Sequence, residues 1–480
     1  MLINKYITAT ILAAVSGGIA NGQAQRAMPR LVVNITIDQL RTDYIEAFSQ
    51  YYSENGFRKF LKEGVVYYNP RFSFRPVDRA SATAGIVTGT SPSNNGITGR
   101  QWLDKASLVP VECTYDNDFK GIFTDECASP QKILTTTIGD ELKMATEGKA
   151  IVYSIAKLRD EAIIGGGHEA DGAFWYNPDK NCWCTSKYYA SKAPKWVEDY
   201  NLLKIKDFND ENENMNVTDF ALECINTTEI GRDDVPDMLY LTYNASLPTQ
   251  KGNVDKQKVQ NKYIQLDREI GRLTSKIESL TGKSGVMIII TGTGYCEEPE
   301  PDRKKYRVPG GTFYVNRTSN LLNMYLSAIY GQDKYVESCF YNQIFLNLKQ
   351  IELKRLDMGE IMERSRSFLI QNSGVRNAFT SNDLMLGGDN RDSELQNWYN
   401  SDRCGDLVVE VYPGWKVLNE DNKQQYNYNE NIIPFPIIFY GNGIVNDRIS
   451  APVTMDRIAP TIAKAIRIRA PNGCPKAPLL

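Results

Sequence analysis

Histidine is almost absent from this chain of 480 residues, which contains only His168. Protein zinc sites depend heavily on imidazole, so the composition leaves little to build one from. An excess of basic charge is also absent, because 55 lysines and arginines face 58 aspartates and glutamates, a formal net charge of −3. This balance offers no basic face and predicts no nucleic-acid partner.

Long apolar runs are missing beyond the start of the chain. No later stretch reaches about 18 apolar residues, so we expect no membrane span. At the start, Lys5 precedes a short apolar stretch from Ile7 to Ala20, and small residues follow as far as Ala24. This layout predicts a secretory signal over residues 1–24, although a buried N-terminal helix is an alternative. With no cysteine near the cut for a lipid anchor, we expect an exported protein of the periplasm, the cell surface or the outer-membrane surface.

Cysteine is present in an odd number, nine, all after the predicted leader. Export permits disulfides, but an odd count leaves at least one thiol unpaired in a monomer. Cys113–Cys127 is the pairing that we expect first. Cys182 and Cys184 lie two apart and have no second pair, so they do not indicate a zinc knuckle.

Short β-branched runs alternate with helical segments along the rest of the chain. The first run, Leu31 to Ile37, ends at Asp38 and is followed by a helix-like stretch from Tyr44. Later runs are Met238–Tyr243, Val286–Thr291 and Pro436–Tyr440. This alternation predicts an α/β fold, a mostly parallel sheet with helices on both faces. Active sites of such sheets lie at the carboxyl ends of the strands, which directs attention to the residues after each run.

Apolar residues recur at spacings of three and four from Val259 to Leu280, which predicts a helix packed on the sheet rather than a membrane or partner helix. A final helix is expected over Met455–Ile466. We expect one domain over residues 25–480, with insertions at about 110–215 and 295–430 that contribute a cap and loops.

Seven segments in family order make the chain resemble the alkaline phosphatase superfamily. It is especially similar to the exported, monomeric, phosphate-irrepressible alkaline phosphatases of Bacteroidetes-type bacteria. The segments are TIDQLRTDY (36–44), GIVTGTSPSNNGITGRQW (85–102), SPQKILTTTIGDELKMAT (129–146), GGGHEADGAFWYN (165–177), GDLVVEVYPGW (405–415), PIIFYGNGI (436–444) and IAPTIA…APNGC (458–474). They span essentially the whole chain after the leader.

The resemblance implies two zinc ions held by aspartates and histidines beside a threonine or serine nucleophile. The first metal aspartate matches Asp38, and the nucleophile position carries Arg79. The other ligand positions carry Leu247, Lys251, Thr293, Gly294 and Pro434. One carboxylate cannot hold two zinc ions, and a guanidinium would repel them, so we expect no zinc cofactor and no family nucleophile.

The residues around Arg79 leave several readings open. Arg79 could pair with Asp38 in place of the lost metals, or it could point to solvent. Ser81 and Thr83 are nearby hydroxyls, but neither has an obvious activating base, and His168 is expected to be structural.

Two charged segments could bind ions. The positions that grip substrate phosphate in the family fall on Leu158 and Asp160, or on Lys157 and Arg159 if the register shifts by one. Arg79, Lys157 and Arg159 could therefore form an anion pocket. The run Glu297, Glu298, Glu300 and Asp302 is read as a solvated loop, with a calcium site as the alternative.

These readings predict a pseudoenzyme, an exported phosphatase-like domain kept for binding or assembly with an unknown envelope partner. The alternative is a hydrolase or transferase of phospho- or sulfo-substrates in a remodelled, non-zinc cleft. A second carboxylate or hydroxyl near Asp38 would favour that alternative. A third alternative, which has the least support, is an active phosphatase whose missing metal ligands come from a partner chain.

Overall fold

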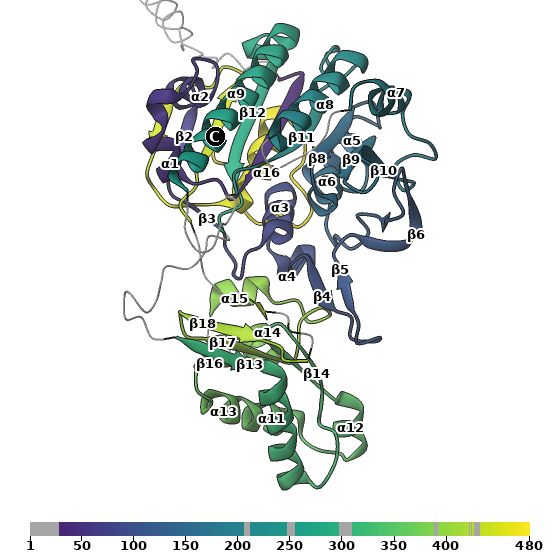
Figure 1. Ribbon diagram of the computed structural model, residues 1–480, viewed down its shortest axis with the longest axis vertical. Helices are drawn as coiled ribbons and strands as arrows, with labels where there is room; N and C mark the ends of the chain where they lie inside the picture. Colours follow the sequence, from purple (N-terminus) through teal and green to yellow (C-terminus); the bar gives the residue numbers. More distant parts are fainter. Residues whose placement is uncertain are drawn as a thin grey trace, which may run out of the picture.

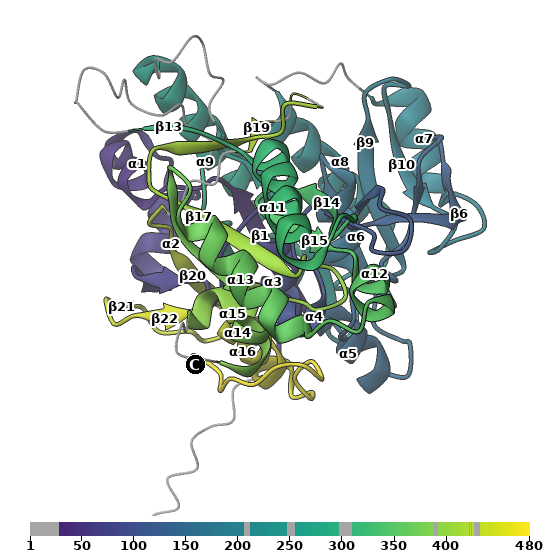
Figure 2. The same cartoon turned by 90° about the horizontal axis from the view of Figure 1, so that it is seen from below.

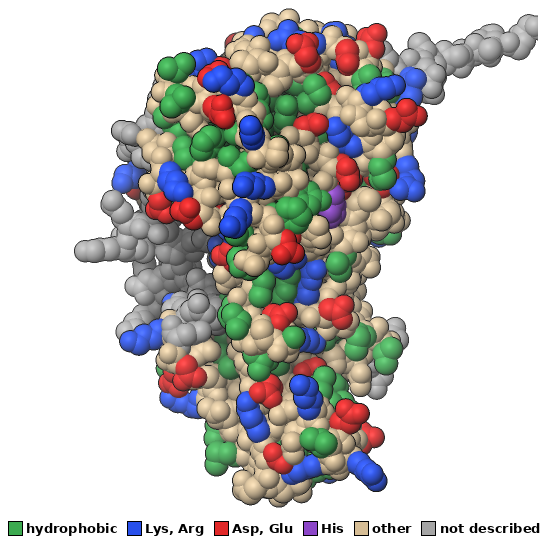
Figure 3. Space-filling view, turned by 90° about the vertical axis from the view of Figure 1, so that its right-hand side faces the viewer, with side chains coloured by type: hydrophobic (Ala, Val, Ile, Leu, Met, Phe, Trp, Pro, Cys, Tyr) green, Lys and Arg blue, Asp and Glu red, His purple; other side chains and the backbone are tan. Residues whose placement is uncertain are grey.

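Figure 1 shows the computed structural model, in which a larger body lies above a smaller lobe. The structure describes residues 28–205, 212–246, 255–296, 310–387, 392–421, 423, 425–426 and 433–480, so the predicted leader lies outside the described residues. Within these ranges, none of the helices is both long and apolar enough to cross a membrane. Figure 3 shows acidic and basic side chains interspersed on the face drawn there, with no large patch of one sign.

An eleven-stranded mixed sheet forms the centre of the larger body. In spatial order its strands are β21 (Asp447–Ile449), β2 (Val65–Tyr67), β20 (Ile437–Gly441), β12 (Val286–Gly292), β1 (Leu31–Asp38), β11 (Asp237–Asn244), β8 (Val152–Ala156), β9 (Gly172–Asn177), β10 (Cys182–Ser186), β6 (Tyr115–Ile122) and β7 (Cys127–Ala128). The strands from β12 to β9 run parallel, and β20 and β10 pair antiparallel beside them. The predicted α/β fold class is confirmed.

Helices cover both faces of this sheet. One face receives α1 (Thr42–Ala47), α2 (Phe57–Glu63), α7 (Lys195–Leu203), α8 (Glu213–Thr227) and α9 (Lys256–Thr281), and the other receives α3 (Arg79–Thr88), α5 (Ile138–Ala145), α6 (Arg159–Gly166) and α16 (Ile458–Ile466). Side chains alternate along a strand, and Leu31, Val33, Ile35 and Ile37 of β1 pack toward the α9 side. Asp38, at the end of β1, therefore faces the side of α3 and α6.

The four strands and the long helix that the sequence indicated lie within a residue or two of their expected ends, except that α9 begins three residues earlier, at Lys256. The apolar positions of α9, from Val259 to Ile277, are buried in the same core as Leu31 and Ile35. The helix packs on the sheet, as predicted. The expected last helix is a short 3-10 turn (Met455–Arg457) that continues into α16.

The smaller lobe contains two further sheets with helices packed on them (Figures 1 and 2). One sheet has the order β14 (Val336–Phe340), β15 (Gln343–Leu346), β17 (Leu407–Val411), β16 (Val375–Thr380), and the other β13 (Gly311–Tyr314), β18 (Trp415–Leu418), β19 (Gln425–Tyr426). The helices are α11 (Val315–Tyr330), α12 (Leu348–Leu353), α13 (Met358–Ile370), α14 (Ser381–Leu386) and α15 (Ser393–Trp398). The predicted domain layout of one domain with two insertions stays a prediction.

The lobe is fixed to the larger body by buried polar and apolar contacts. Trp398 Nε1 donates to the carbonyl of Thr98 at 2.7 Å, and Arg75 pairs with Glu410 at 2.8 Å. Helix α4 (Pro92–Asn95) and the hairpin of β4 (Gln101–Leu103) and β5 (Pro110–Glu112) lie between the two parts in Figure 1. Leu103 of this hairpin packs against Phe340 of the lobe.

The predicted Cys113–Cys127 disulfide is wrong, because neither Cys113 nor Cys127 forms a disulfide in the structure. In the pairing of β6 with β7, Cys127 lies opposite Lys120. The backbone N–H of Cys113 donates to the carbonyl of Arg100 at 2.8 Å, which holds Cys113 beside the start of β4.

Candidate functional site

Asp38 lies at the carboxyl end of β1 and is only 6% exposed. The hydroxyl of Thr293 donates to its Oδ1 at 2.9 Å, and the side-chain amide of Gln39 donates to its Oδ2 at 3.4 Å. The same hydroxyl accepts the backbone N–H of Gln39 at 2.9 Å, which fixes its orientation. Burial raises the pKa of Asp38, while the charge of Arg79 and hydrogen bonds from Thr293, Tyr295 and Gln39 partly offset that rise. The donors that contact this carboxylate are neutral.

Arg79 is the first residue of α3, and its side chain is 15% exposed. Its Nη2 donates to Asp160 Oδ2 at 2.9 Å, and its Nε lies 3.8 Å from Glu161 Oε1. No hydrogen bond or ion pair joins it to Asp38, although both residues are described. The predicted Asp38–Arg79 contact is therefore wrong, and so is the alternative that Arg79 points to solvent. The reason is that α6 places a closer carboxylate beside the guanidinium.

Asp160 and Glu161 occupy the first turn of α6, where the helix dipole favours negative charge. Arg79 sits at the start of α3, where the same effect is unfavourable to a cation, and the two carboxylates compensate for it. Burial would lower the pKa of Arg79, but the charges of Asp160 and Glu161 outweigh burial and raise it. The guanidinium is thus held permanently charged inside the protein.

Glu161 is a site residue that the sequence reading missed. It is 2% exposed, and burial raises its pKa well above the ordinary value, with Arg79 opposing and Asp38 adding to the rise. The guanidinium of Arg79 and the carboxylate of Asp38 therefore act on the pKa of Glu161 in opposite directions. The sequence signal that could have identified Glu161 is its position, shortly after the parallel strand β8 and next to Arg159 and Asp160.

The other predicted metal positions converge on the same edge of the sheet where the structure describes them. Ile433 donates its backbone N–H to the carbonyl of Gly294 at 3.1 Å, and Thr42 donates to the carbonyl of Pro434 at 2.9 Å. Leu247 and Lys251 lie outside the described residues. The family positions thus meet in space, but the side chains there differ from those of a metal site.

Gly294 shows why a ligand would not fit at its position. Its φ is +74°, and a Cβ there would lie 2.8 Å from the ring of Phe72 and 2.9 Å from the ring of Phe435. The two rings stack with centroids 5.8 Å apart. Aromatic side chains therefore fill the space that an imidazole from residue 294 would need.

The possible metal ligands at this edge of the sheet do not fit a pair of zinc ions. Asp38 is one carboxylate, and its oxygens already accept bonds from Thr293 and Gln39. Among the described residues, no group of three or more histidines, cysteines, aspartates or glutamates is placed to hold a metal ion. Zinc sites need about three or four protein ligands.

Only part of the predicted anion pocket comes together. Arg79 and Arg159 line one pocket of about 280 Å³, as do Leu158 and Asp160. Lys157 is not in its lining and donates instead to the buried Glu213 at 2.6 Å. The role of this pocket as an anion site stays a prediction.

Neither substitute nucleophile is available to a substrate. Ser81 is fully buried, and its hydroxyl and backbone N–H form the capping box of α3 with Asp78. Thr83 is fully buried within the same helix. The acidic run from Glu297 to Asp302 lies outside the described residues.

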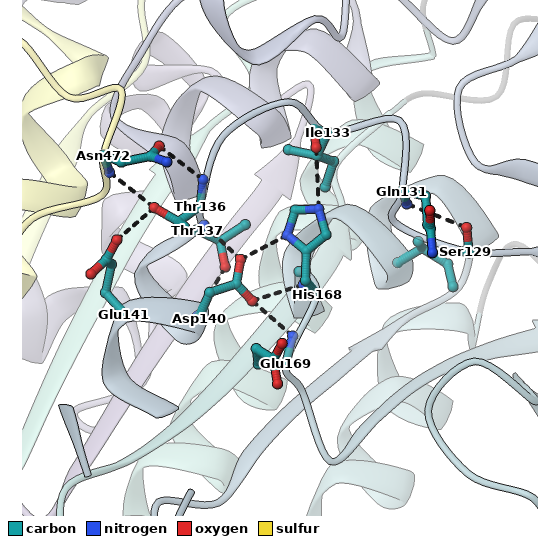
Figure 4. Close-up of polar contacts among 12 residues, drawn as sticks. Ser129, Gln131, Ile133, Thr136, Thr137, Asp140, Glu141, His168, Glu169 and Asn472 are labelled. Carbon is teal, nitrogen blue, oxygen red and sulfur yellow. Dashed lines mark hydrogen bonds and ion pairs between the residues drawn. The ribbon is translucent and has the colours of Figure 1, made fainter. Parts of the chain in front are cut away.

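His168 lies apart from these groups, in a network built on Asp140 (Figure 4). Its Nδ1 is 3.0 Å from Asp140 Oδ2, and its Nε2 is 3.1 Å from the carbonyl of Ile133. Burial would lower the pKa of His168, but the hydrogen bond and charge of Asp140, together with the carbonyl of Ile133 and the charge of Glu169, outweigh burial and raise it. Both ring nitrogens have acceptors, which agrees with the expected structural role.

The sequence also matches a family model over residues 32–432, described as type I phosphodiesterase / nucleotide pyrophosphatase. The chain belongs to the type I phosphodiesterase / nucleotide pyrophosphatase family. This result supports the predicted superfamily, because the proteins to which this chain is similar include alkaline phosphatases.

One relative is the alkaline phosphatase PafA of Elizabethkingia meningoseptica, 24% identical over 97% of each chain. A protein of Myroides odoratus named as a calcium-transporting ATPase is 25% identical over 93% of each chain. The crystal structure of wild-type PafA superposes with a TM-score of 0.81 at 22% identity, covering 95% of this chain and 99% of that one. At this identity the likeness shows the fold of the family and not its chemistry.

Proposed function

We propose that this phosphodiesterase-family chain is an exported, alkaline-phosphatase-like pseudoenzyme. It acts by binding, as a component of the bacterial envelope, and has no two-zinc phosphatase activity. Its former active-site edge is filled by neutral donors and aromatic rings on one side and by an internal ion pair on the other.

The observation that carries this proposal is the largely buried pair of Arg79 and Asp160, 2.9 Å apart at the position that the resemblance assigns to the nucleophile. A guanidinium cannot lose its proton to become a nucleophile. Its fixed charge also opposes two dications placed beside Asp38. The filled space at Gly294 supports the absence of a zinc pair as well, because a metal-binding side chain at this position would not fit.

A second candidate is a hydrolase or transferase of phospho- or sulfo-substrates that uses a remodelled, non-zinc site. It is favoured by the two buried carboxyl groups with raised pKa values, Asp38 and Glu161, which resemble an acid–base set. Against it, Glu161 is 2% exposed and does not line the pocket. We therefore place the binding role first.

The test is the zinc content of the purified mature protein, measured together with hydrolysis of phosphate and sulfate monoesters and phosphate diesters, with and without added zinc. We expect neither stoichiometric zinc nor turnover. Zinc-dependent turnover would overturn the proposal. Turnover without zinc that is lost in Asp38→Asn would favour the second candidate instead.

A matched variant sharpens this test. Arg79→Thr restores a hydroxyl at the nucleophile position but leaves Gly294 and Thr293 unchanged, so we expect no gain of activity. Affinity capture of envelope proteins with the wild-type chain would then identify the partner that the binding role requires.

A further inference from the structure

A pocket of about 280 Å³ lies where the start of α6, the β4–β5 hairpin and the β14–β15 turn meet. Its charged lining consists of Arg79, Arg100, Arg159, Glu112, Glu126 and Asp160. Three guanidinium groups thus face three carboxylates, and the lining carries no net formal charge. A simple anion would meet as many repelling as attracting groups in this pocket.

The charges are nevertheless separated within the pocket. Arg79 is neutralised by Asp160, whereas Arg159 pairs with both Glu112 and Glu126. One cation therefore balances two half-exposed carboxylates, which leaves an excess of negative charge on that side.

The excess of positive charge lies at Arg100. Its side chain is exposed and lines the pocket, and within the described part of the chain its guanidinium has no hydrogen bond or ion pair. The backbone N–H of Cys113 donates to the carbonyl of Arg100, which places Arg100 next to the end of β5, the strand that carries Glu112. Opposite charges therefore flank one small cavity.

A buried polar group also lines this cavity without a partner. Thr114 is 1% exposed, and among the described residues its Oγ1 has no hydrogen-bond partner. A buried hydroxyl without a partner costs free energy, so a polar atom brought within hydrogen-bond distance of Thr114 Oγ1 would stabilise the protein.

We propose that this pocket binds a small zwitterion of the α-amino acid type. The ligand carboxylate pairs with Arg100, and the ligand ammonium lies beside Glu112 and Glu126. Inorganic phosphate suits the pocket less well, because Arg79 and Arg159 are already engaged by carboxylates. The inference rests on the proposed binding role and specifies its ligand.

The experiment is isothermal titration calorimetry of the mature wild-type chain with each free L-amino acid, with putrescine, and with inorganic phosphate. We expect at least one amino acid to bind with an affinity about tenfold or more above that of putrescine and phosphate, because two charge-assisted contacts act together. Equal or tighter binding of phosphate would overturn the proposal, as would the absence of binding by every amino acid.

Three variants locate the site. Arg100→Gln should weaken amino-acid binding about tenfold or more, whereas Arg317→Gln, an exposed arginine of α11, should leave it unchanged. The double variant Glu112→Gln with Glu126→Gln releases Arg159, so it should lose amino-acid binding and gain phosphate binding. Unchanged amino-acid binding in both Arg100→Gln and the double variant would overturn the proposal.

Thermal unfolding of each variant separates loss of the site from loss of the fold. The zinc and hydrolysis measurements are independent of these titrations. Amino-acid binding by a chain that also proves to hydrolyse phosphate esters would refute the pseudoenzyme and leave the pocket assignment intact.

Discussion

Two aspartates with little exposure each pair with one cation, and the two cations differ in kind. Asp160 pairs with Arg79 at the edge of the sheet, and Asp140 pairs with His168 at the start of α5. A guanidinium keeps its charge at any working pH, whereas an imidazolium can lose its proton. The first pair is therefore a fixed structural charge, and the second can respond to pH.

The aspartates also differ in how much of their surroundings depends on them. Asp140 accepts the backbone N–H groups of Thr137, His168 and Glu169, so it would stay bonded if the imidazole were neutral (Figure 4). Asp160 accepts a backbone N–H only from Glu161, and Arg79 has only these two carboxylates as ion-pair partners within the described residues. The site edge therefore depends more on the Arg79–Asp160 pair than the start of α5 depends on the Asp140–His168 pair.

The largest effect is expected for Asp160→Asn, which leaves the buried guanidinium with Glu161 alone. Breaking one side of a buried pair should lower the free energy of unfolding by about 3 kcal/mol, measured by urea denaturation at pH 7. The control is Glu420→Gln, which removes the partner of the exposed Arg317 and should cost less than about 1 kcal/mol. Equal losses in the two variants would contradict the contrast.

Arg79→Met should produce a loss of stability that depends on pH. Without the guanidinium, the pKa values of Asp38 and Glu161 should rise further above those of the unfolded chain, about 4. The folded state then binds protons more tightly, so the cost is smallest near pH 4 and grows as the pH rises toward 8. Denaturation of wild type and variant across this range measures it, and a cost independent of pH would refute the coupling.

Thr293→Val should remove the hydroxyl that donates to Asp38 and accepts from Gln39. Leaving these buried groups unpaired should cost about 1–3 kcal/mol at pH 7, read from thermal unfolding. Thr227→Val, which removes an exposed hydroxyl from α8, is the matched control and should change stability little. A similar small loss in both variants would mean that Asp38 does not depend on Thr293.

His168→Gln is expected to have the smallest effect. The pKa of His168 is raised on folding, so its contribution to stability is complete below about pH 6.5 and is lost as the pH rises through the folded value. The variant should be less stable than wild type by about 1 kcal/mol at pH 6, and the difference should shrink by pH 9. Because the chain has no other histidine, a difference that stays constant over this range would count against the imidazolium pair.

The sequence was sufficient to predict the four sheet strands and the long helix α9, because the spacing of apolar residues within each segment shows which side chains are buried. It also brought attention to Asp38, Arg79 and the segment from Lys157 to Asp160. It could not give the partner of Arg79, since Asp160 lies 81 residues away and becomes a neighbour only when α3 packs on α6. Glu161 was missed for the same reason. The strands of the smaller lobe showed no comparable alternation with helices, and of them only Leu407–Val411 lay within a motif that carried the resemblance.

The pocket has one wall that the larger body does not provide. Tyr341, in the turn between β14 and β15 with a φ of +52°, belongs to the smaller lobe and lines the pocket with residues of α3 and α6. A molecule that binds against Tyr341 touches both parts and therefore favours the arrangement in which they are docked. By thermodynamic reciprocity, a change that weakens docking of the lobe must weaken ligand binding by the same factor. Occupancy of the pocket and the position of the lobe are therefore coupled.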